Sequence, residues 1–372
     1  MWADRRFMQL VGSELPLMLA PMAGPGTVAL ALAVCEAGGL GGLPCAMLTP
    51  EQAHADLSAI KAGTERPFNA NFFCHVAPVP DAAREAGWRA RLAPYFRELG
   101  LDPAAPVTAP NRVPFGEEMC RVLEDIRPRV ASFHFGLPDA AFVARLKAAG
   151  CIIMSSATTV AEAKWLEARG ADAIIAQGYE AGGHRGMFLS DDLATQVGTF
   201  ALVPQIVDAV SVPVIAAGGV SDGRGFAAAL VLGASAVSVG TAYLFTPEAK
   251  VIPPYRAALG RARDTPTAIT NVMTGRPARG LVNRFIREVG PISADAPQFP
   301  LASGAVATVR AAAEAAGSGD FTAQWSGQAA SLALEFLARE MGAGALTRHL
   351  AETCKAALSG SSLAGSSLGG AG

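Results

Sequence analysis

The 372-residue sequence contains little charge and few cysteines, and both shortages exclude classes of protein. Charged residues make up 17% of the chain, and 30 Lys and Arg stand against 32 Asp and Glu, which gives a net charge of −2. Without a basic excess the chain has little to neutralise a phosphate backbone, so we expect no nucleic-acid partner. The six cysteines form no C-x-x-C pair and no cluster with zinc-ligand spacing, so we expect no metal site and a reducing, cytoplasmic location.

Two further absences concern membranes and nucleotides. The longest uncharged runs, residues 15–35 and 225–247, are interrupted by Pro and Gly or by Gly and Ser, so we expect no membrane-spanning helix. The sequence contains no G-x-x-x-x-G-K-[ST] motif, and no G-x-G-x-x-G follows the first apolar run. Neither a P-loop nor a Rossmann nucleotide site is therefore supported. With 51% hydrophobic residues, the composition is that of a globular protein.

One pattern repeats along most of the chain: an apolar run that ends in Gly or polar residues, followed by an Ala-rich amphipathic stretch. The apolar runs are rich in Val, Ile, Leu and Ala and lack strict alternation, which is typical of strands buried on both faces. Alternating strands and helices of this kind predict a (β/α)8 TIM barrel. The predicted strands are residues 17–21, 39–43, 68–73, 130–135, 151–155, 173–177, 212–216 and 236–240.

Two segments exceed this repeat. Residues 77–129, after the third strand, are predicted to form a helical insertion. We place the barrel at residues 1–245 and a largely helical C-terminal part, packed on the barrel, at residues 246–358. Residues 359–372 consist only of Gly, Ser, Ala and Leu, and we expect a disordered tail there.

The loop after the sixth strand has the composition of an active site. In a TIM barrel the reacting groups follow the carboxyl ends of the strands. Here residues 177–186 place Gln177, Glu180, His184 and Arg185 among four glycines. An imidazole exchanges a proton near neutral pH, and glycines let the backbone approach a ligand closely. We predict that His184 is catalytic; the alternative is a loop histidine that caps a helix end.

The seventh and eighth strands end in glycine-containing loops, residues 217–225 and 239–241. Each loop exposes backbone N–H groups at the start of a helix, which is where such barrels hold a phosphate. A tight strand-to-helix turn would also need glycine, but two such loops at neighbouring strands favour a phosphate site. The sequence therefore predicts that the phosphate of a cofactor or substrate binds at these two loops.

Single polar residues in apolar strands give two more candidates. Asn71 lies in the third strand, where an amide needs partners, and we interpret it as a ligand contact rather than a structural amide. His134 ends the fourth strand and is predicted to line the substrate pocket; the alternative is a core histidine with satisfied hydrogen bonds. For His75, which follows the third strand, we favour an exposed loop position.

Several of these segments together resemble the nitronate monooxygenase family, formerly called 2-nitropropane dioxygenases, of class I. The similar segments are L-A-P-M-A-G at 19–24, N-F-F at 71–73, S-F-H-F-G at 132–136, E-A-G-G-H-R-G at 180–186, G-G at 218–219 and W-S-G-Q at 325–328. The resemblance implies a TIM barrel that holds FMN non-covalently. It also implies oxidation of alkyl nitronates, of the propionate 3-nitronate type, by O2 to a carbonyl compound and nitrite, without a metal or reduced nicotinamide.

The matching segments carry the family's functional residues onto this chain. The resemblance implies that His184 takes the α-proton of a neutral nitroalkane or, when protonated, offsets the charge of a bound nitronate. The implied partners are a nitronate and O2, and we expect a monomer or a homodimer. The implied FMN contacts are the backbone of Ala20, Pro21 and Met22, the amides of Asn71 and Gln177, the bordering Gly182 and Gly183, and the phosphate-binding Gly218, Gly219, Gly240 and Thr241.

Other functions on the same barrel stay open from the sequence. Enoyl-ACP reductases that use FMN and NAD(P)H have a very similar Gly-Gly-His loop, and NAD(P)H-dependent quinone reductases share the fold. The His184-Arg185-Gly186 ending and the long C-terminal part favour the monooxygenase. A third interpretation is a barrel that binds flavin without turnover. The sequence departs from the family pattern at two places: at Asn69, where the family often has Gly, and at Ala242-Tyr243 after the eighth strand. These departures leave substrate size and anion preference open.

Overall fold

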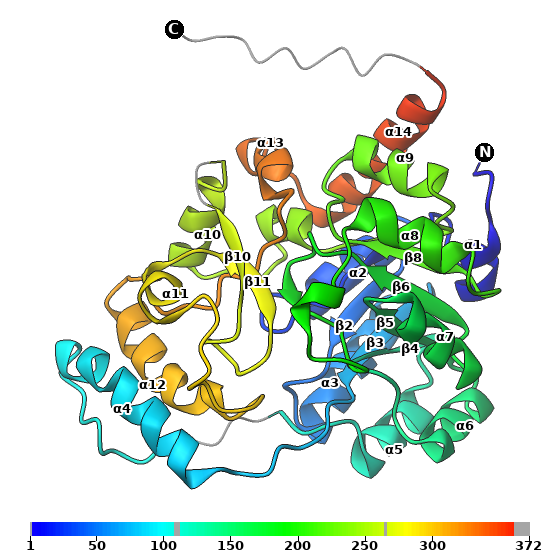
Figure 1. Ribbon diagram of the computed structural model, residues 1–372. Coiled ribbons are helices and arrows are strands. Elements are labelled where there is room, and N and C mark those ends of the chain that lie inside the picture. Colours follow the sequence, from blue (N-terminus) through cyan, green and yellow to red (C-terminus); the bar gives the residue numbers. More distant parts are fainter. Residues whose placement is uncertain (1, 108–111, 264–265, 361–372) are drawn as a thin grey trace, which may run out of the picture.

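Eight parallel strands form the centre of the protein in the computed structural model, which describes residues 2–107, 112–263 and 266–360. Their order is β1-β9-β8-β6-β5-β4-β3-β2. The two end strands also meet, because Leu40 N donates to Leu17 O and Leu19 N donates to Leu40 O, each at 2.9 Å. The sheet therefore closes, and the predicted (β/α)8 TIM barrel is confirmed (Figure 1).

Each predicted strand overlaps one strand of the barrel. Several helices begin where a side chain accepts a hydrogen bond from the first turn, as Thr27, Thr49, Thr159 and Asp222 do. The barrel strands are β1 (Leu17–Leu19), β2 (Gly41–Pro44), β3 (Phe68–Phe73), β4 (Val130–His134), β5 (Ile152–Ala157), β6 (Ala173–Gln177), β8 (Val214–Ala217) and β9 (Ala236–Val239). The helices up to β9 are α1 (Arg6–Val11), α2 (Val28–Glu36), α3 (Pro50–Gly63), α4 (Ala82–Glu98), α5 (Glu117–Ile126), α6 (Ala140–Ala148), α7 (Val160–Ala168), η1 (Leu193–Thr195), α8 (Thr199–Val207) and α9 (Gly223–Val231).

The barrel strands are buried on both faces. Leu17 and Leu19 pack with residues of the surrounding helices, whereas Met18 between them points into the barrel. There Met18 shares a cluster with Phe7 of α1 and with residues near the starts of other strands. Helix α1 therefore closes the amino-terminal end of the barrel, which leaves the carboxyl ends of the strands for a site.

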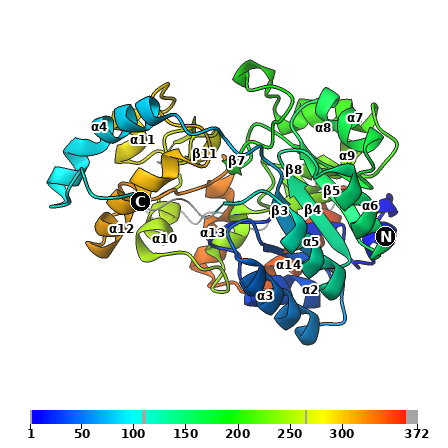
Figure 2. The same cartoon turned by 90° about the horizontal axis from the view of Figure 1, so that it is seen from below.

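A second group of elements packs beside the barrel, and we call α4 with residues 267–325 the cap. Trp88 of α4 is buried against Phe285, and its indole N–H donates to Ala302 O at 3.2 Å. Two views at right angles show α4 lying along α11 and α12, to one side of the barrel (Figures 1 and 2). The cap contains β10 (Thr267–Thr270), β11 (Ala278–Leu281), α11 (Arg284–Val289) and α12 (Ala302–Ala315).

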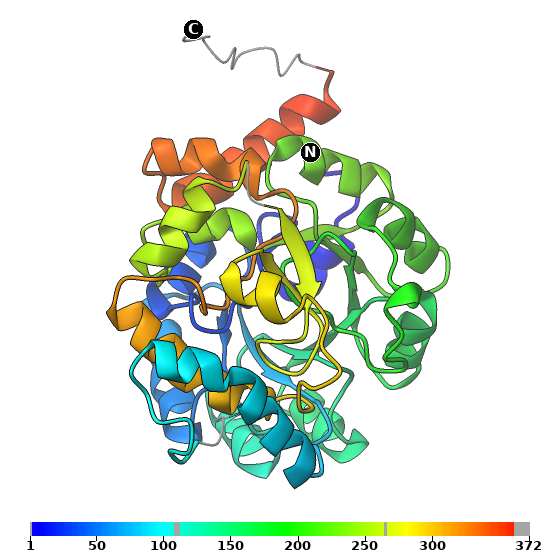
Figure 3. The ribbon, with the colours of Figure 1, turned by 60° about the vertical axis from the view of Figure 1, so that its left-hand side comes forward.

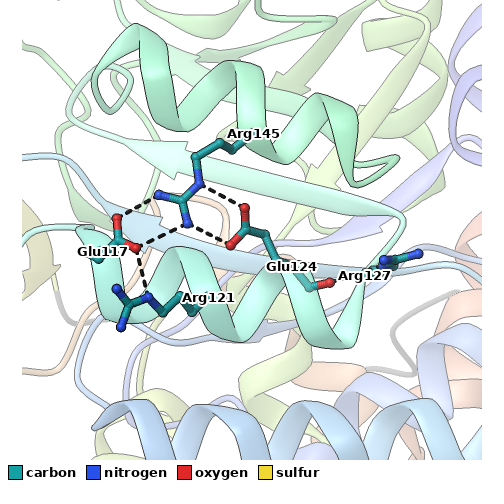
Figure 4. Close-up of polar contacts among 5 residues, drawn as sticks. All are labelled: Glu117, Arg121, Glu124, Arg127 and Arg145. Carbon is teal, nitrogen blue, oxygen red and sulfur yellow. Dashed lines mark hydrogen bonds and ion pairs between the residues drawn. The ribbon is translucent and has the colours of Figure 1, made fainter.

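The predicted insertion at 77–129 divides between cap and barrel. Only α4 leaves the barrel, because α5 packs against α3 and α6 in the helical ring. Arg145 of α6 joins it there: its Nη1 lies 2.7 Å from Glu117 and its Nη2 2.7 Å from Glu124, both on α5 (Figure 4). Helix α5 is thus the ordinary helix that follows the third strand.

The part after β9 contains two strands, β10 and β11, besides the expected helices. Strands β10 and β11 were not predicted, because four-residue strands with mixed composition depend on tertiary pairing. Helix α14 (Ala343–Leu358) packs between α9 and α2 and so completes the ring around the barrel (Figure 3). The remaining elements are η2 (Thr241–Phe245), α10 (Pro253–Gly260), η3 (Ala330–Ala333) and α13 (Leu334–Ala338). From residue 361 the expected tail lies outside the described residues.

Within the described residues, no helix has the length and apolar character needed to cross a membrane.

If α14 is part of the barrel, truncating a side chain on its buried face should lower the free energy of unfolding. Leu350 is fully buried in the main core cluster, so Leu350→Ala leaves a cavity and should lower the free energy of unfolding by about 2 to 5 kcal/mol. The control Glu352→Ala, on the exposed face of the same helix, should change it by less than about 0.5 kcal/mol. Urea unfolding measures both. Equal small effects would mean that α14 is dispensable.

Candidate active site

A cavity of about 590 Å³ opens at the carboxyl ends of the barrel strands and continues under the cap. The cap adds Arg310 and Trp325 to its wall, and the connection between α4 and α5 adds Arg112. The structure brings all the predicted site residues to this cavity: Ala20, Pro21, Met22, Asn71, His134, Gln177, Gly182, Gly183, His184, Gly218, Gly219, Gly240 and Thr241.

His184 belongs to a strand that the barrel loop contributes to the cap. Residues Gly183–His184 form β7, which pairs antiparallel with β11 so that His184 lies opposite Ala278. The next residue continues the pairing, since Arg185 N donates to Pro277 O at 2.8 Å. The hairpin of β10 and β11 lies in front of the barrel in Figure 3, and its pairing with β7 holds the strand that contains the histidine.

The main-chain carbonyl of His184 accepts two hydrogen bonds from the barrel. Gln177 Nε2 donates to it at 2.9 Å, and His134 Nε2 lies 3.1 Å from it. A carbonyl can only accept, so His134 carries its proton on Nε2, and its Nδ1 can accept from Ser156 Oγ at 3.0 Å. Burial lowers the pKa of His134 to about 3, which keeps the ring neutral. His134 and Gln177 therefore both position the His184 loop.

Further bonds fix the rest of this loop. Gln177 Oε1 accepts from Gly186 N at 2.7 Å, so both ends of the Gln177 amide are used within the loop. The guanidinium of Arg185 is fully buried and donates to Gln177 O at 2.8 Å and to Gly178 O at 2.7 Å. The polar residues that mark the loop in the sequence thus build its shape, and only part of them face the cavity.

The His184 ring lies among aromatic residues and one hydroxyl. Its centroid is 5.2 Å from that of Phe299 and 5.5 Å from that of Trp325, and its Nε2 is 2.9 Å from Thr274 Oγ1. Burial, and then the positive charge of Arg112, hold the pKa of His184 well below its usual value. The imidazole is therefore neutral at pH 7 and can accept a proton.

Several glycines of the strand-end loops line the cavity, and we call Gly182, Gly183, Gly218, Gly219 and Gly240 the glycine wall. Gly218 has φ +105°, and a Cβ there would lie 2.8 Å from Ala181 N. A Cβ on Gly182 would lie 2.5 Å from Gly327 N. Close backbone packing between neighbouring loops therefore requires glycine at both positions.

The two asparagines of β3 have different surroundings. Asn71 lines the cavity, and its Nδ2 donates to Ser132 Oγ at 2.9 Å, which fixes the orientation of the amide. Asn69 is fully buried beside Gly42, and neither polar atom of its side chain has a hydrogen-bond partner. Asn69 is absent from the cavity wall, so its departure from the family pattern does not alter the site directly.

His75 is not exposed, contrary to the expectation from the sequence. Only 5% of its surface is accessible, and neither ring nitrogen has a hydrogen-bond partner. The ring packs edge-on against Phe299, with centroids 4.8 Å apart. The prediction was wrong because Phe299, distant in the sequence, covers the loop. Burial, and then the charge of Arg276, lower the pKa of His75 to about 4.

The fold and the cavity define a TIM-barrel enzyme, and comparison with known proteins identifies its family. The sequence model of the nitronate monooxygenase family matches residues 5–350. The chain is 44% identical over 340 residues to the nitronate monooxygenase of Pseudomonas aeruginosa, which covers 90% of this chain and 96% of that protein. The chain belongs to the nitronate monooxygenase family, as its motifs indicate, and is an oxidoreductase.

Two solved structures are similar over nearly the whole chain. Nitroalkane oxidase from Streptomyces ansochromogenes has a TM-score of 0.86 and 38% identity, and the match covers 96% of this chain and 100% of that one. FabK from Thermotoga maritima has a TM-score of 0.73 and 27% identity, with 97% and 98% covered. The nitronate monooxygenase family is in general flavin-dependent.

The buried state of His75 has a measurable consequence for stability. Below pH 6.5 an unfolded chain protonates this histidine, whereas the folded protein, with a pKa of about 4, does not, so stability falls as the pH falls from 6.5 towards 4. Between pH 5.5 and 4.5 the free energy of unfolding of the variant His75→Phe should fall less steeply than that of the wild type, by about 1 kcal/mol per pH unit. Urea unfolding at each pH measures the slope. An unchanged slope would show that His75 protonates freely in the folded state.

Proposed function

We propose that the protein binds FMN at the mouth of the barrel and oxidises alkyl nitronates, of the propionate 3-nitronate type, with O2 to a carbonyl compound and nitrite. The observation that carries this proposal is a neutral histidine, His184, fixed by both the barrel and the cap beside a glycine-lined cavity. Membership of the nitronate monooxygenase family supports the same chemistry.

The residues present suit a bound FMN. The backbone of Ala20, Pro21 and Met22, together with the Asn71 amide, would border the ring system, since all four line the cavity. Bound flavin supplies the electron-accepting group and the reaction with O2. The phosphate would lie at Gly218, Gly219, Gly240 and Thr241, while Gly182 and Gly183 would allow the loop to approach the ring.

His184 would accept the proton that a nitroalkane substrate loses. A neutral imidazole accepts the α-proton of a nitroalkane, and the hydrogen bond between its Nε2 and Thr274 Oγ1 orients the ring. A nitronate arrives already deprotonated, so it does not need this step. The cap over the cavity would exclude water from the reacting carbon, which protects the substrate while O2 reacts.

The substrate distinction tests the role of His184. The variant His184→Asn should lower kcat/KM for neutral nitroethane at least 100-fold, because a positioned general base contributes about 10²- to 10⁴-fold. For ethyl nitronate the loss should be much smaller. Oxygen consumption and nitrite release measure both in FMN-loaded protein. Unchanged turnover of nitroethane would remove His184 from the reaction, and rapid flavin bleaching by NADH or NADPH would favour a reductase instead.

The glycine wall gives a separate test of cofactor binding. In Gly218→Ala the new Cβ would have to displace Ala181 N or shift the loop, in a backbone conformation that side chains rarely adopt. We expect the dissociation constant for FMN to rise at least tenfold in a fluorescence titration. Gly87→Ala, at an open position of α4, is the matched control and should leave it unchanged. Full FMN affinity in Gly218→Ala would place the cofactor elsewhere.

A further inference from the structure

The two nitrogen atoms of the His184 ring have different surroundings. Nε2 lies 2.9 Å from Thr274 Oγ1 of the cap. Nδ1 has no hydrogen-bond partner among the described residues, but it is not enclosed by protein, whereas both ring nitrogens of His75 are buried without a partner. Because His184 lines the cavity, Nδ1 is the ring nitrogen that a ligand in the cavity can reach.

The turn between β10 and β11 holds Thr274 in place. The side chain of Asn271 donates to Ser293 O and accepts from Ser293 N, each at 2.9 Å. The carbonyl of Asn271 in turn accepts from Thr274 N at 3.3 Å and from Gly275 N at 2.7 Å. A Cβ on Gly275 would collide with Pro297 O, so the turn also packs tightly against the segment before α12. Thr274 therefore has little freedom to move away from the ring.

Thr274 is placed to act on His184 and not on a ligand. Only 3% of its surface is accessible, and it is not among the residues that line the cavity. Its hydroxyl oxygen lies near two polar atoms, His184 Nε2 at 2.9 Å and Arg276 O at 3.4 Å. A hydroxyl carries one hydrogen atom, so Thr274 can donate to only one of these two atoms.

The direction of these bonds decides which nitrogen of His184 has a lone pair. A neutral imidazole carries one proton, either on Nδ1 or on Nε2. If Thr274 donates to Nε2, the proton is on Nδ1, and no lone pair faces the cavity. If Nε2 carries the proton, it donates to Thr274 Oγ1, and the hydroxyl turns its own hydrogen towards Arg276 O, which can only accept. Only this second arrangement leaves Nδ1 able to act as a general base.

We propose that Thr274 is a positioning residue that keeps the proton of neutral His184 on Nε2, so that Nδ1 is the atom that accepts the proton of the substrate. This inference rests on the proposed function, because it names the atom of His184 that acts there. In the step the bond between the α-carbon and its hydrogen breaks, the proton moves to Nδ1, and the electron pair stays on the substrate, which becomes a nitronate. Nε2 and the Thr274 hydroxyl keep their hydrogens throughout.

Nitrogen NMR of isotopically labelled, FMN-loaded protein tests the tautomer without turnover. Protonated and unprotonated imidazole nitrogens have well-separated resonances, and the chain contains five histidines, so the His184 signals can be identified by their loss in His184→Asn. Near neutral pH we expect a protonated Nε2 and an unprotonated Nδ1 in the wild type.

Two substitutions of Thr274 should change this spectrum in different ways. Thr274→Val keeps the shape of the side chain but leaves Nε2 without an acceptor, whereas Nδ1 can donate to water in the cavity. A buried N–H without an acceptor is unfavourable, so the population should shift towards the tautomer with the proton on Nδ1. Thr274→Ser keeps the hydroxyl and should keep the wild-type tautomer.

Steady-state kinetics then connect the tautomer to the reaction. In Thr274→Val, kcat for nitroethane should fall about 3- to 10-fold with little change in KM, as expected for the loss of one neutral hydrogen bond. Because ethyl nitronate needs no base, its kcat/KM should stay within about twofold of the wild-type value. Thr274→Ser should restore the turnover of nitroethane.

Thr270→Val is the matched control in the same hairpin. Thr270 is fully buried, and its hydroxyl donates to Pro291 O at 2.7 Å and not to His184. Weaker packing of the cap should therefore appear in this variant too, with equal effects on both substrates and an unchanged tautomer. FMN content and thermal unfolding identify a variant that fails to fold, and the wild-type spectrum then decides.

The outcomes separate this inference from the proposed function. Wild-type protein that oxidises neither nitroethane nor ethyl nitronate would refute the proposed function, while the spectrum would still decide which ring nitrogen carries the proton. A protonated Nδ1 in the wild type would overturn the inference. So would a wild-type tautomer and wild-type nitroethane turnover in Thr274→Val, or equal losses for both substrates that Thr270→Val reproduces.

Discussion

The main chain of His184 is the point at which the two parts of the molecule meet. Its carbonyl accepts hydrogen bonds from Gln177 and His134 of the barrel, and its strand pairs with β11 of the cap. A carbonyl held by two buried donors and a strand held by its neighbour leave the imidazole little freedom. The position of His184 over the glycine wall, and the chemistry we propose for it, depend on this double attachment.

The barrel and the cap contribute different residues to the site around His184. The barrel contributes glycines and Asn71 to the cavity wall, whereas the cap contributes Arg310 and Trp325 to the wall and Thr274 and Phe299 beside the His184 ring. The cap is assembled from α4 and from residues 267–325, so its wall combines segments far apart in the sequence. We therefore propose that changes in the cap alter substrate preference while the cofactor site stays intact.

Features that depend on short-range sequence patterns can be predicted from the sequence. Features that depend on contacts between distant segments cannot. Apolar runs followed by glycine-rich loops predicted the barrel, and all the candidate residues reached one cavity, because carboxyl ends of parallel strands share one end of the barrel. The place of α14 in the ring and the pairing of β7 with β11 have no local signal. The burial of His75 by Phe299 has no local signal either.

The most direct test of the account is an anaerobic absorbance titration of the FMN-loaded protein with propionate 3-nitronate. We predict that the oxidised flavin bands decrease as nitronate is added and return when air is admitted, with nitrite released. Flavin bands that ignore the nitronate but disappear on addition of NADH or NADPH would contradict it, and would assign the cavity to a nicotinamide-dependent reductase.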